Sequence, residues 1–160
     1  MRWAGHVPAS LTRERDIADT WDVGRLLILD DDDQVRLTLA EVAQALGHQV
    51  RTAPDGRQGL ELFEREPFDC VITDLAMPDV DGLTVLRRVK KKSPGTGVLV
   101  ITGNSTVDLL AASVNMGVDA YVTKPFKIAE IDEQIRRILD KAREREAAAK
   151  ASRPKGPIRR

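Results

Sequence analysis

A strand followed by a helix recurs five times between residues 25 and 140, and this alternation limits the possible folds more than any other feature of the sequence. The first unit opens with Leu-Leu-Ile-Leu at 26–29, an apolar run typical of a strand buried on both faces of a parallel sheet. Apolar residues then recur at helical spacing up to Leu46, and Gly47 suits the position after a helix end. Further strands are predicted at 48–52, 68–73, 98–101 and 120–123. Strict alternation predicts an α/β fold, with a doubly wound five-stranded parallel sheet and helices on both faces.

Polar residues follow four of the predicted strands. They are Asp30 and Asp31 after the first, Asp74 after the third, Thr102 after the fourth and Lys124 after the fifth. In an open parallel sheet these positions meet at one edge, where ligands bind. Carboxylates brought together repel one another unless a cation joins them, and oxygen ligands suit Mg²⁺. Asp74 is then a candidate nucleophile that forms an acyl phosphate. The Thr102 hydroxyl and the Lys124 ammonium are candidates to hold phosphoryl oxygens.

Four motifs that contain these residues resemble the receiver domain of bacterial two-component response regulators, of the single-domain type related to chemotaxis regulators. They are Leu-Asp-Asp-Asp at 29–32, Thr-Asp-Leu-Ala-Met-Pro-Asp-Val-Asp-Gly at 73–82, Val-Ile-Thr-Gly at 100–103 and Asp-Ala-Tyr-Val-Thr-Lys-Pro-Phe at 119–126. Their order and spacing make the set far more specific than any one motif. The resemblance spans about residues 25–140 and implies a flavodoxin-like (βα)5 receiver fold with strand order 2-1-3-4-5.

The resemblance also implies the parts of a metal-dependent phosphoacceptor site. Asp74 matches the residue that takes the phosphoryl group. Asp31 matches a direct carboxylate ligand of the metal, and Asp30 a carboxylate that usually acts through water. Ala76 matches the position whose backbone carbonyl binds the metal. The implied cofactor is Mg²⁺, with Mn²⁺ as an alternative.

A second set of residues matches the groups that bind the phosphoryl oxygens and transmit the signal. Thr102 matches the switch hydroxyl, Lys124 the phosphoryl-binding lysine and Tyr121 the aromatic residue that reorients on activation. Pro125 matches a proline that usually follows a cis peptide bond in this family, an isomer that costs only about 0.5–1 kcal/mol before proline.

The implied function is that of a stand-alone response regulator. Its phosphoryl donor is a sensor histidine kinase or a histidine phosphotransfer protein. The chain assists its own phosphorylation and dephosphorylation but is not expected to be a dedicated enzyme. It is expected to signal by phosphorylation-dependent contact with an unknown downstream protein. The resemblance allows a homodimer through the face formed by helix 106–116, strand 120–123 and the helix that begins near residue 128.

Two other functions share part of this pattern. A metal-dependent phosphohydrolase with an aspartyl nucleophile also uses Asp, Thr and Lys, but it usually carries an acidic residue two positions after the nucleophile, where this chain has Ala76. A regulator fragment that contacts DNA would use the tail at 141–160, which has eight basic and two acidic residues. No helix-turn-helix pattern follows residue 140, so nucleic acid is not an expected partner.

The remaining expectations concern the ends of the chain and its surroundings. Residues 1–24 are predicted to form a flexible arm, 25–140 the receiver domain, and 141–160 a basic helical extension with a disordered tail. The single cysteine, Cys70, excludes an internal disulfide. No apolar stretch has the length of a membrane span or signal peptide, so no membrane contact is expected and the cytoplasm is the expected location. His48 is expected at the surface, and Asp33 is a candidate cap of the first helix.

Overall fold

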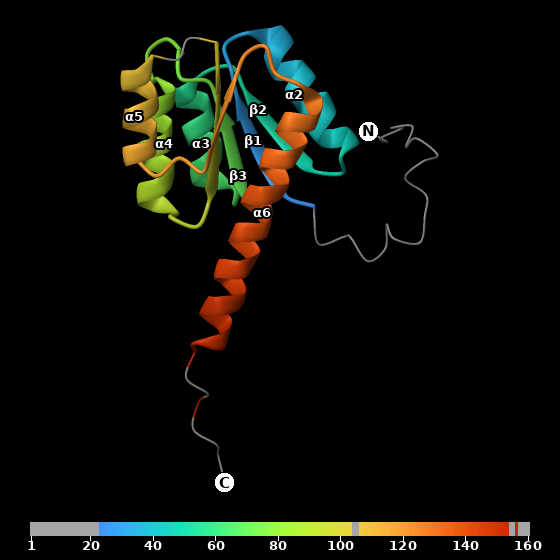
Figure 1. The fold of residues 1–160 in the computed structure, drawn as a ribbon, viewed down its shortest axis with the longest axis vertical. Helices are drawn as coiled ribbons and strands as arrows, with labels where there is room; N and C mark the ends of the chain where they lie inside the picture. The colour runs from blue at the N-terminus through green and yellow to red at the C-terminus, as the bar shows by residue number, and fades with distance from the viewer. Residues whose placement is uncertain (1–22, 104–105, 154–155, 157–160) are drawn as a thin grey trace.

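The computed structural model describes residues 23–103, 106–153 and 156, and nearly all of the predicted N-terminal arm lies outside them. Within these residues, five parallel strands form one sheet in the order β2-β1-β3-β4-β5 (Figure 1). The strands are β1 Arg25–Leu29, β2 Gln49–Ala53, β3 Cys70–Thr73, β4 Gly97–Thr102 and β5 Ala120–Thr123. The predicted doubly wound fold and strand order are therefore confirmed.

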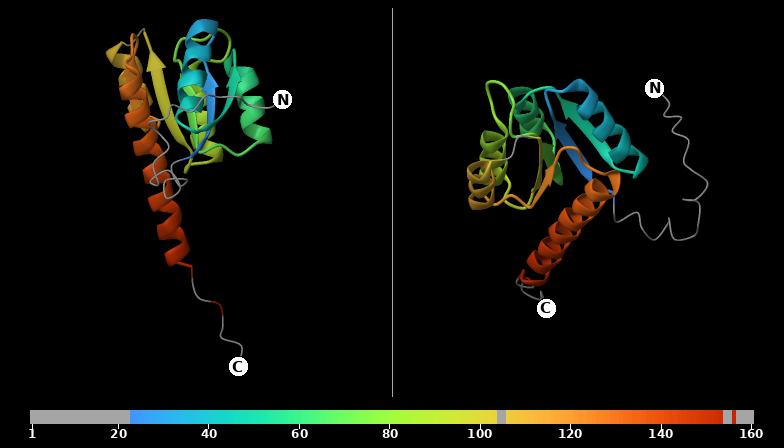
Figure 2. Two further views of the ribbon diagram at one scale, coloured as in Figure 1. Left: turned by 90° about the vertical axis from the view of Figure 1, so that its right-hand side faces the viewer. Right: turned by 45° about the horizontal axis from the view of Figure 1, so that its top comes forward.

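The helices divide between the two faces of the sheet (Figures 1 and 2). Their bounds are α2 Asp33–Ala45, α3 Gly56–Arg65, α4 Gly82–Lys92, α5 Val107–Asn115 and α6 Ile128–Ala151. Apolar residues of α2 and α6 pack with one side of the strands, and those of α3, α4 and α5 pack with the other. Two hydrophobic cores result, one on each face.

Strand β1 shows why the strands carry continuous apolar runs. Leu26 and Ile28 belong to the core under α2 and α6, whereas Leu27 and Leu29 belong to the core under α3 and α4. All four are at most 1% exposed. Burial of each such side chain contributes about 1.5–3 kcal/mol, so a polar residue on either face of this strand would be costly.

The start of β3 differs from the prediction. The predicted strand began at Phe68, but the observed strand begins at Cys70. Before it, a carboxylate oxygen of Asp69 accepts the Arg25 backbone N–H at 2.8 Å, while the Asp69 N–H donates to the Arg25 carbonyl at 2.8 Å. At Asp69, the hydrogen bond from the Arg25 N–H thus goes to a side-chain oxygen instead of a backbone carbonyl, and the regular pairing of β3 with β1 begins only after it.

Two further expectations at the ends of α2 are wrong. The N-cap is Asp32, not Asp33, because the Asp32 carboxylate accepts the backbone N–H groups of Gln34 and Val35. His48 is buried, not exposed. It lies where β2 begins beside β1, and its Nδ1 accepts the Gly24 backbone N–H at 3.0 Å. Gly47 lies between helix and strand at a φ of 94°, which agrees with its predicted place after the helix end.

Helix α6 continues well past the edge of the sheet (Figures 1 and 2). It has 24 residues, and its buried side chains Ile131, Ile135, Ile138 and Leu139 all lie in the first half. Residues 144–151 are exposed, so this end of the helix is a solvated extension. No helix in the described part of the chain combines the length and the apolar composition that a membrane span requires.

Candidate functional site

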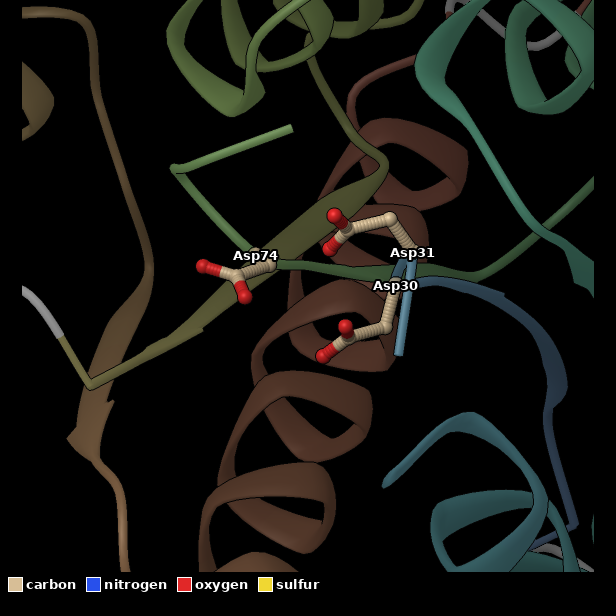
Figure 3. Close-up of side chains that lie close together, drawn as sticks. All are labelled: Asp30, Asp31 and Asp74. Carbon is tan, nitrogen blue, oxygen red and sulfur yellow. The ribbon is translucent and has the colours of Figure 1, made fainter. Parts of the chain in front are cut away.

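Three aspartates meet where β1 and β3 end side by side. Leu29 is the register partner of Thr73, and the Asp74 backbone N–H donates to the Leu29 carbonyl at 3.1 Å. This pairing places Asp74 next to Asp30 and Asp31, as Figure 3 shows. One carboxylate oxygen from each of the three residues lies within 4.8 Å of the others. Asp30 and Asp74 are buried, whereas Asp31 is exposed.

Lys124 joins two of these carboxylates from the end of β5. Its Nζ donates to Asp30 Oδ2 at 2.9 Å and to Asp74 Oδ2 at 2.8 Å. Its backbone N–H donates to the carbonyl of Thr102 at 2.9 Å, so Thr102 and Lys124 are held together at the ends of β4 and β5. Thr102 itself is fully buried. The structure therefore brings together the polar residues that the strand-end argument selected.

Backbone N–H groups orient the two buried carboxylates. Asp30 Oδ1 accepts the N–H of Asp32 at 2.9 Å, and Asp74 Oδ1 accepts the N–H of Ala76 at 3.1 Å. No hydrogen bond from another described residue reaches the exposed carboxylate of Asp31. Asp31 is thus the carboxylate most available to an added ligand. The metal-binding role of the Ala76 carbonyl stays a prediction.

Burial and ion pairing act in opposite directions on the charges of this site. Burial raises the pKa of Asp30, and the hydrogen bonds from Lys124 and the Asp32 N–H only partly offset it. For Lys124, burial acts to lower the pKa, but hydrogen bonds to Asp30 and Asp74 outweigh it and the pKa is raised. Lys124 therefore stays charged, while the ionised form of Asp30 would gain from a further cation nearby.

The loop after Asp74 is held by a close backbone contact with the start of α4. The Gly82 N–H donates to the Leu75 carbonyl at 3.0 Å, and a Cβ added at Gly82 would lie 2.1 Å from the Asp74 carbonyl oxygen. Asp79 in the same loop has a φ of 65°, in the left-handed region. The contact of Gly82 was not predicted from the sequence. Its only signal is Asp81-Gly82 before a helical pattern, which is typical of many helix starts.

Arg36 in α2 also contacts this site, and the sequence pattern did not predict that contact. Its Nη1 donates to the backbone carbonyl of Asp30 at 2.7 Å. The only sequence signal is an arginine three residues after Asp33, a spacing that usually indicates a surface ion pair.

The predicted switch residue Tyr121 lies in β5, and the predicted cis-proline Pro125 lies just after this strand. Tyr121 is paired in register with Val100 and packs against the core under α3 and α4. Among the described residues, its hydroxyl is the buried side-chain polar group with no hydrogen-bond partner. The Lys124–Pro125 peptide bond is cis. The switch role of Tyr121 stays a prediction.

The fold and site define a doubly wound α/β domain with an acidic cluster and a lysine at the carboxyl edge of its sheet. This is the place where ligands bind in open parallel sheets. A family model described as the response regulator receiver domain matches residues 26–136. The chain therefore belongs to the response regulator receiver family, and the resemblance seen in its motifs is confirmed.

Similar proteins agree with this assignment. Response regulator MprA of Mycolicibacterium vanbaalenii is 35% identical over 115 residues, which are 72% of this chain and 50% of that protein. Transcriptional regulatory protein AfsQ1 of Streptomyces coelicolor is 33% identical over 127 residues, which are 79% and 56% of the two chains. The chain thus spans about half the length of these curated relatives. A CheY-like receiver domain protein from Methanospirillum hungatei has a solved structure with 29% identity and a TM-score of 0.75, covering 77% of this chain and 98% of that one.

Proposed function

We propose that this chain is a stand-alone, cytoplasmic response regulator in which Asp74 accepts a phosphoryl group from a sensor histidine kinase or a histidine phosphotransfer protein. The observation that carries the proposal is the Lys124 Nζ donating to Asp74 Oδ2 at 2.8 Å, within a site where Asp30 and Asp31 lie beside Asp74. A lysine on the nucleophilic carboxylate is placed to bind the incoming phosphoryl oxygens.

The transfer uses the carboxylate of Asp74 as nucleophile. A carboxylate oxygen forms a bond to phosphorus as the bond between phosphorus and the donor imidazole nitrogen breaks, and the imidazole leaves with the bonding electron pair. The product carboxyl carries no charge of its own, so Lys124 transfers its hydrogen bond to a phosphoryl oxygen. The Thr102 hydroxyl, at the end of the neighbouring strand, is assigned a second phosphoryl oxygen.

The oxygen donors of the site fit Mg²⁺, with Mn²⁺ as the alternative. Three carboxylate oxygens lie within 4.8 Å of one another, and the exposed Asp31 has no described hydrogen-bond partner. Hard divalent cations prefer such carboxylate oxygens together with backbone carbonyls and water. Asp30, Asp31, Asp74 and the Ala76 carbonyl would hold the ion. When bound, it supplies positive charge between the anionic phosphoryl group and the carboxylates.

The proposed output is binding to a downstream protein through α5, β5 and α6, the face that would also form a homodimer. Val107, Leu110 and Val114 are 83%, 39% and 61% exposed on α5. They recur at helical spacing, so they form one apolar stripe. An exposed apolar stripe of this kind supports a protein-binding surface.

The test is phosphorylation by a small donor with a phosphorus–nitrogen bond. Purified protein is incubated with Mg²⁺ and phosphoramidate, and intact mass measures the added phosphoryl group. We expect labelling of the wild type and of the control Asp140→Asn, an exposed position on α6. We expect none for Asp74→Asn. Unlabelled wild type, or labelled Asp74→Asn, would refute the proposal.

A second assay, turnover of small phosphate esters, separates this function from that of a phosphohydrolase. The methyl side chain of Ala76 cannot act as the second acid or base that such an enzyme uses. We therefore propose that the chain is not a dedicated enzyme and expect no sustained turnover of small phosphate esters. Multiple turnover that is lost in Asp74→Asn would favour the hydrolase instead.

A further inference from the structure

Arg36 ties together the two ends of the acidic loop between β1 and α2. Its Nη1 donates to the backbone carbonyl of Asp30 at 2.7 Å, and its Nη2 donates to the carboxylate of Asp33. Its side chain is only 13% exposed, which is low for a charged residue at a helix start. A planar guanidinium holds two acceptors in one fixed arrangement, whereas an ammonium is a single point of charge.

The bond to the Asp30 carbonyl fixes the peptide group that leads into Asp31. Because that group is planar, its orientation sets the direction in which the Asp31 side chain leaves the backbone. Lys124 and backbone N–H groups hold the carboxylates of Asp30 and Asp74 directly. The Asp31 carboxylate has no comparable contact among the described residues, so its placement depends on its backbone.

We propose that Arg36 is a positioning residue for the cation site, holding Asp31 where its carboxylate joins those of Asp30 and Asp74. The inference rests on the proposed function, because the cation is the Mg²⁺ of that site. The guanidinium contacts neither the Asp31 nor the Asp74 carboxylate and acts through the Asp30–Asp31 peptide group.

Positioning and simple charge make opposite predictions for Mg²⁺ affinity. By Coulomb's law, removal of a nearby positive charge tightens the binding of a cation. Loss of a group that orients a metal ligand instead weakens binding, typically by about 10–100-fold. We expect Arg36→Gln to bind Mg²⁺ about 10-fold more weakly than the wild type. Arg36→Lys keeps the charge but not the two-point geometry, so we expect it also to bind several-fold more weakly.

The test is calorimetric titration of metal-free protein with MgCl₂, with urea unfolding of each variant in parallel. Arg136→Gln is the matched control, because Arg136 pairs with Asp132 on the exposed side of α6 and undergoes the same change of charge. We expect its Mg²⁺ affinity to equal that of the wild type. At saturating Mg²⁺ we expect both Arg36 variants to be labelled by phosphoramidate to the wild-type extent.

Wild-type or tighter Mg²⁺ binding by a folded Arg36 variant would overturn the inference. If Arg36→Gln does not fold, Arg36→Lys decides the question, since it keeps a positive charge at this position. Asp31→Asn separates the two proposals. Weak binding by Asp31→Asn together with unchanged binding by the Arg36 variants would leave the proposed function standing and remove the positioning role. A wild type that binds no Mg²⁺ would overturn both.

Discussion

Replacement of Gly82 by alanine should disturb the phosphoacceptor loop although Gly82 takes no part in the chemistry. The added Cβ would lie 2.1 Å from the Asp74 carbonyl oxygen, 2.7 Å from Leu75 Cα and 2.8 Å from the Asp74 carbonyl carbon. All three are backbone atoms, so no side-chain rotation relieves the contact. Real Cβ atoms essentially never come within 3.0 Å of such atoms. The loop or the start of α4 must therefore move by roughly 1 Å, since packed interiors hold little free space.

This displacement has two measurable consequences. Overpacking of a well-packed site costs about 1–3 kcal/mol, so we expect the free energy of unfolding of Gly82→Ala to fall by this amount. A shift of about 1 Å in a reacting group lowers rates on the order of 100-fold, so we also expect much slower labelling of Asp74 by phosphoramidate. Urea unfolding and the time course of intact mass measure the two effects separately.

Gly95→Ala is the matched control for this substitution. A Cβ at Gly95 meets nothing within 4 Å, and the residue is exposed between α4 and β4. We expect its stability to stay within about 1 kcal/mol of the wild type, with any change a small gain from reduced freedom of the unfolded chain. Labelling should be unchanged. Wild-type stability and labelling in Gly82→Ala would refute the argument that this backbone contact positions Asp74.

Three further predictions use urea unfolding of the metal-free protein. Asp79→Val should lower the free energy of unfolding by about 1–2 kcal/mol, because the φ of residue 79 is 65° and a β-branched residue is strained there. Asp79→Gly should be nearly neutral, and equal stabilities of the Val and Gly variants would contradict this account. Tyr121→Phe should raise stability by about 1 kcal/mol, because it removes a buried hydroxyl without a described partner; a loss would indicate a hidden hydrogen bond. Asp30→Asn should stabilise the protein near neutral pH, because burial raises the pKa of Asp30 and folding therefore disfavours its ionised form. Below the ordinary carboxyl pKa, Asp30 is protonated in both the folded and the unfolded protein, so its ionisation costs no stability there. As pH rises from that range towards the raised pKa of the folded state, the free energy of unfolding falls, so the stability gain of Asp30→Asn should vanish in acid. A gain that does not change with pH would exclude this cause.

The sequence alone determined the fold class and the residues that meet at the carboxyl edge of the sheet. Continuous apolar runs and helical periodicity are local patterns, and strict alternation leaves few topologies. Because parallel strands end at one edge, the sequence suffices to group Asp30, Asp31, Asp74 and Lys124. The cap at Asp32, one residue from the predicted candidate, shows the limit of this reasoning. All residues of the acidic run are good caps, and only the observed backbone angles at Asp32 choose among them.

The tertiary structure decided the contacts that depend on exact approach between elements. Lys124 reaches both Asp30 and Asp74, residues 94 and 50 positions away. This follows from the register of four neighbouring strands, β1, β3, β4 and β5, and from the direction of one long side chain. The buried place of His48 and the close contact of Gly82 likewise depend on distances between backbones. Arg36 looks like half of a surface ion pair in the sequence, and only the structure shows its bond to the Asp30 carbonyl. Periodicity specifies which face a residue occupies, but packing specifies which atoms it meets.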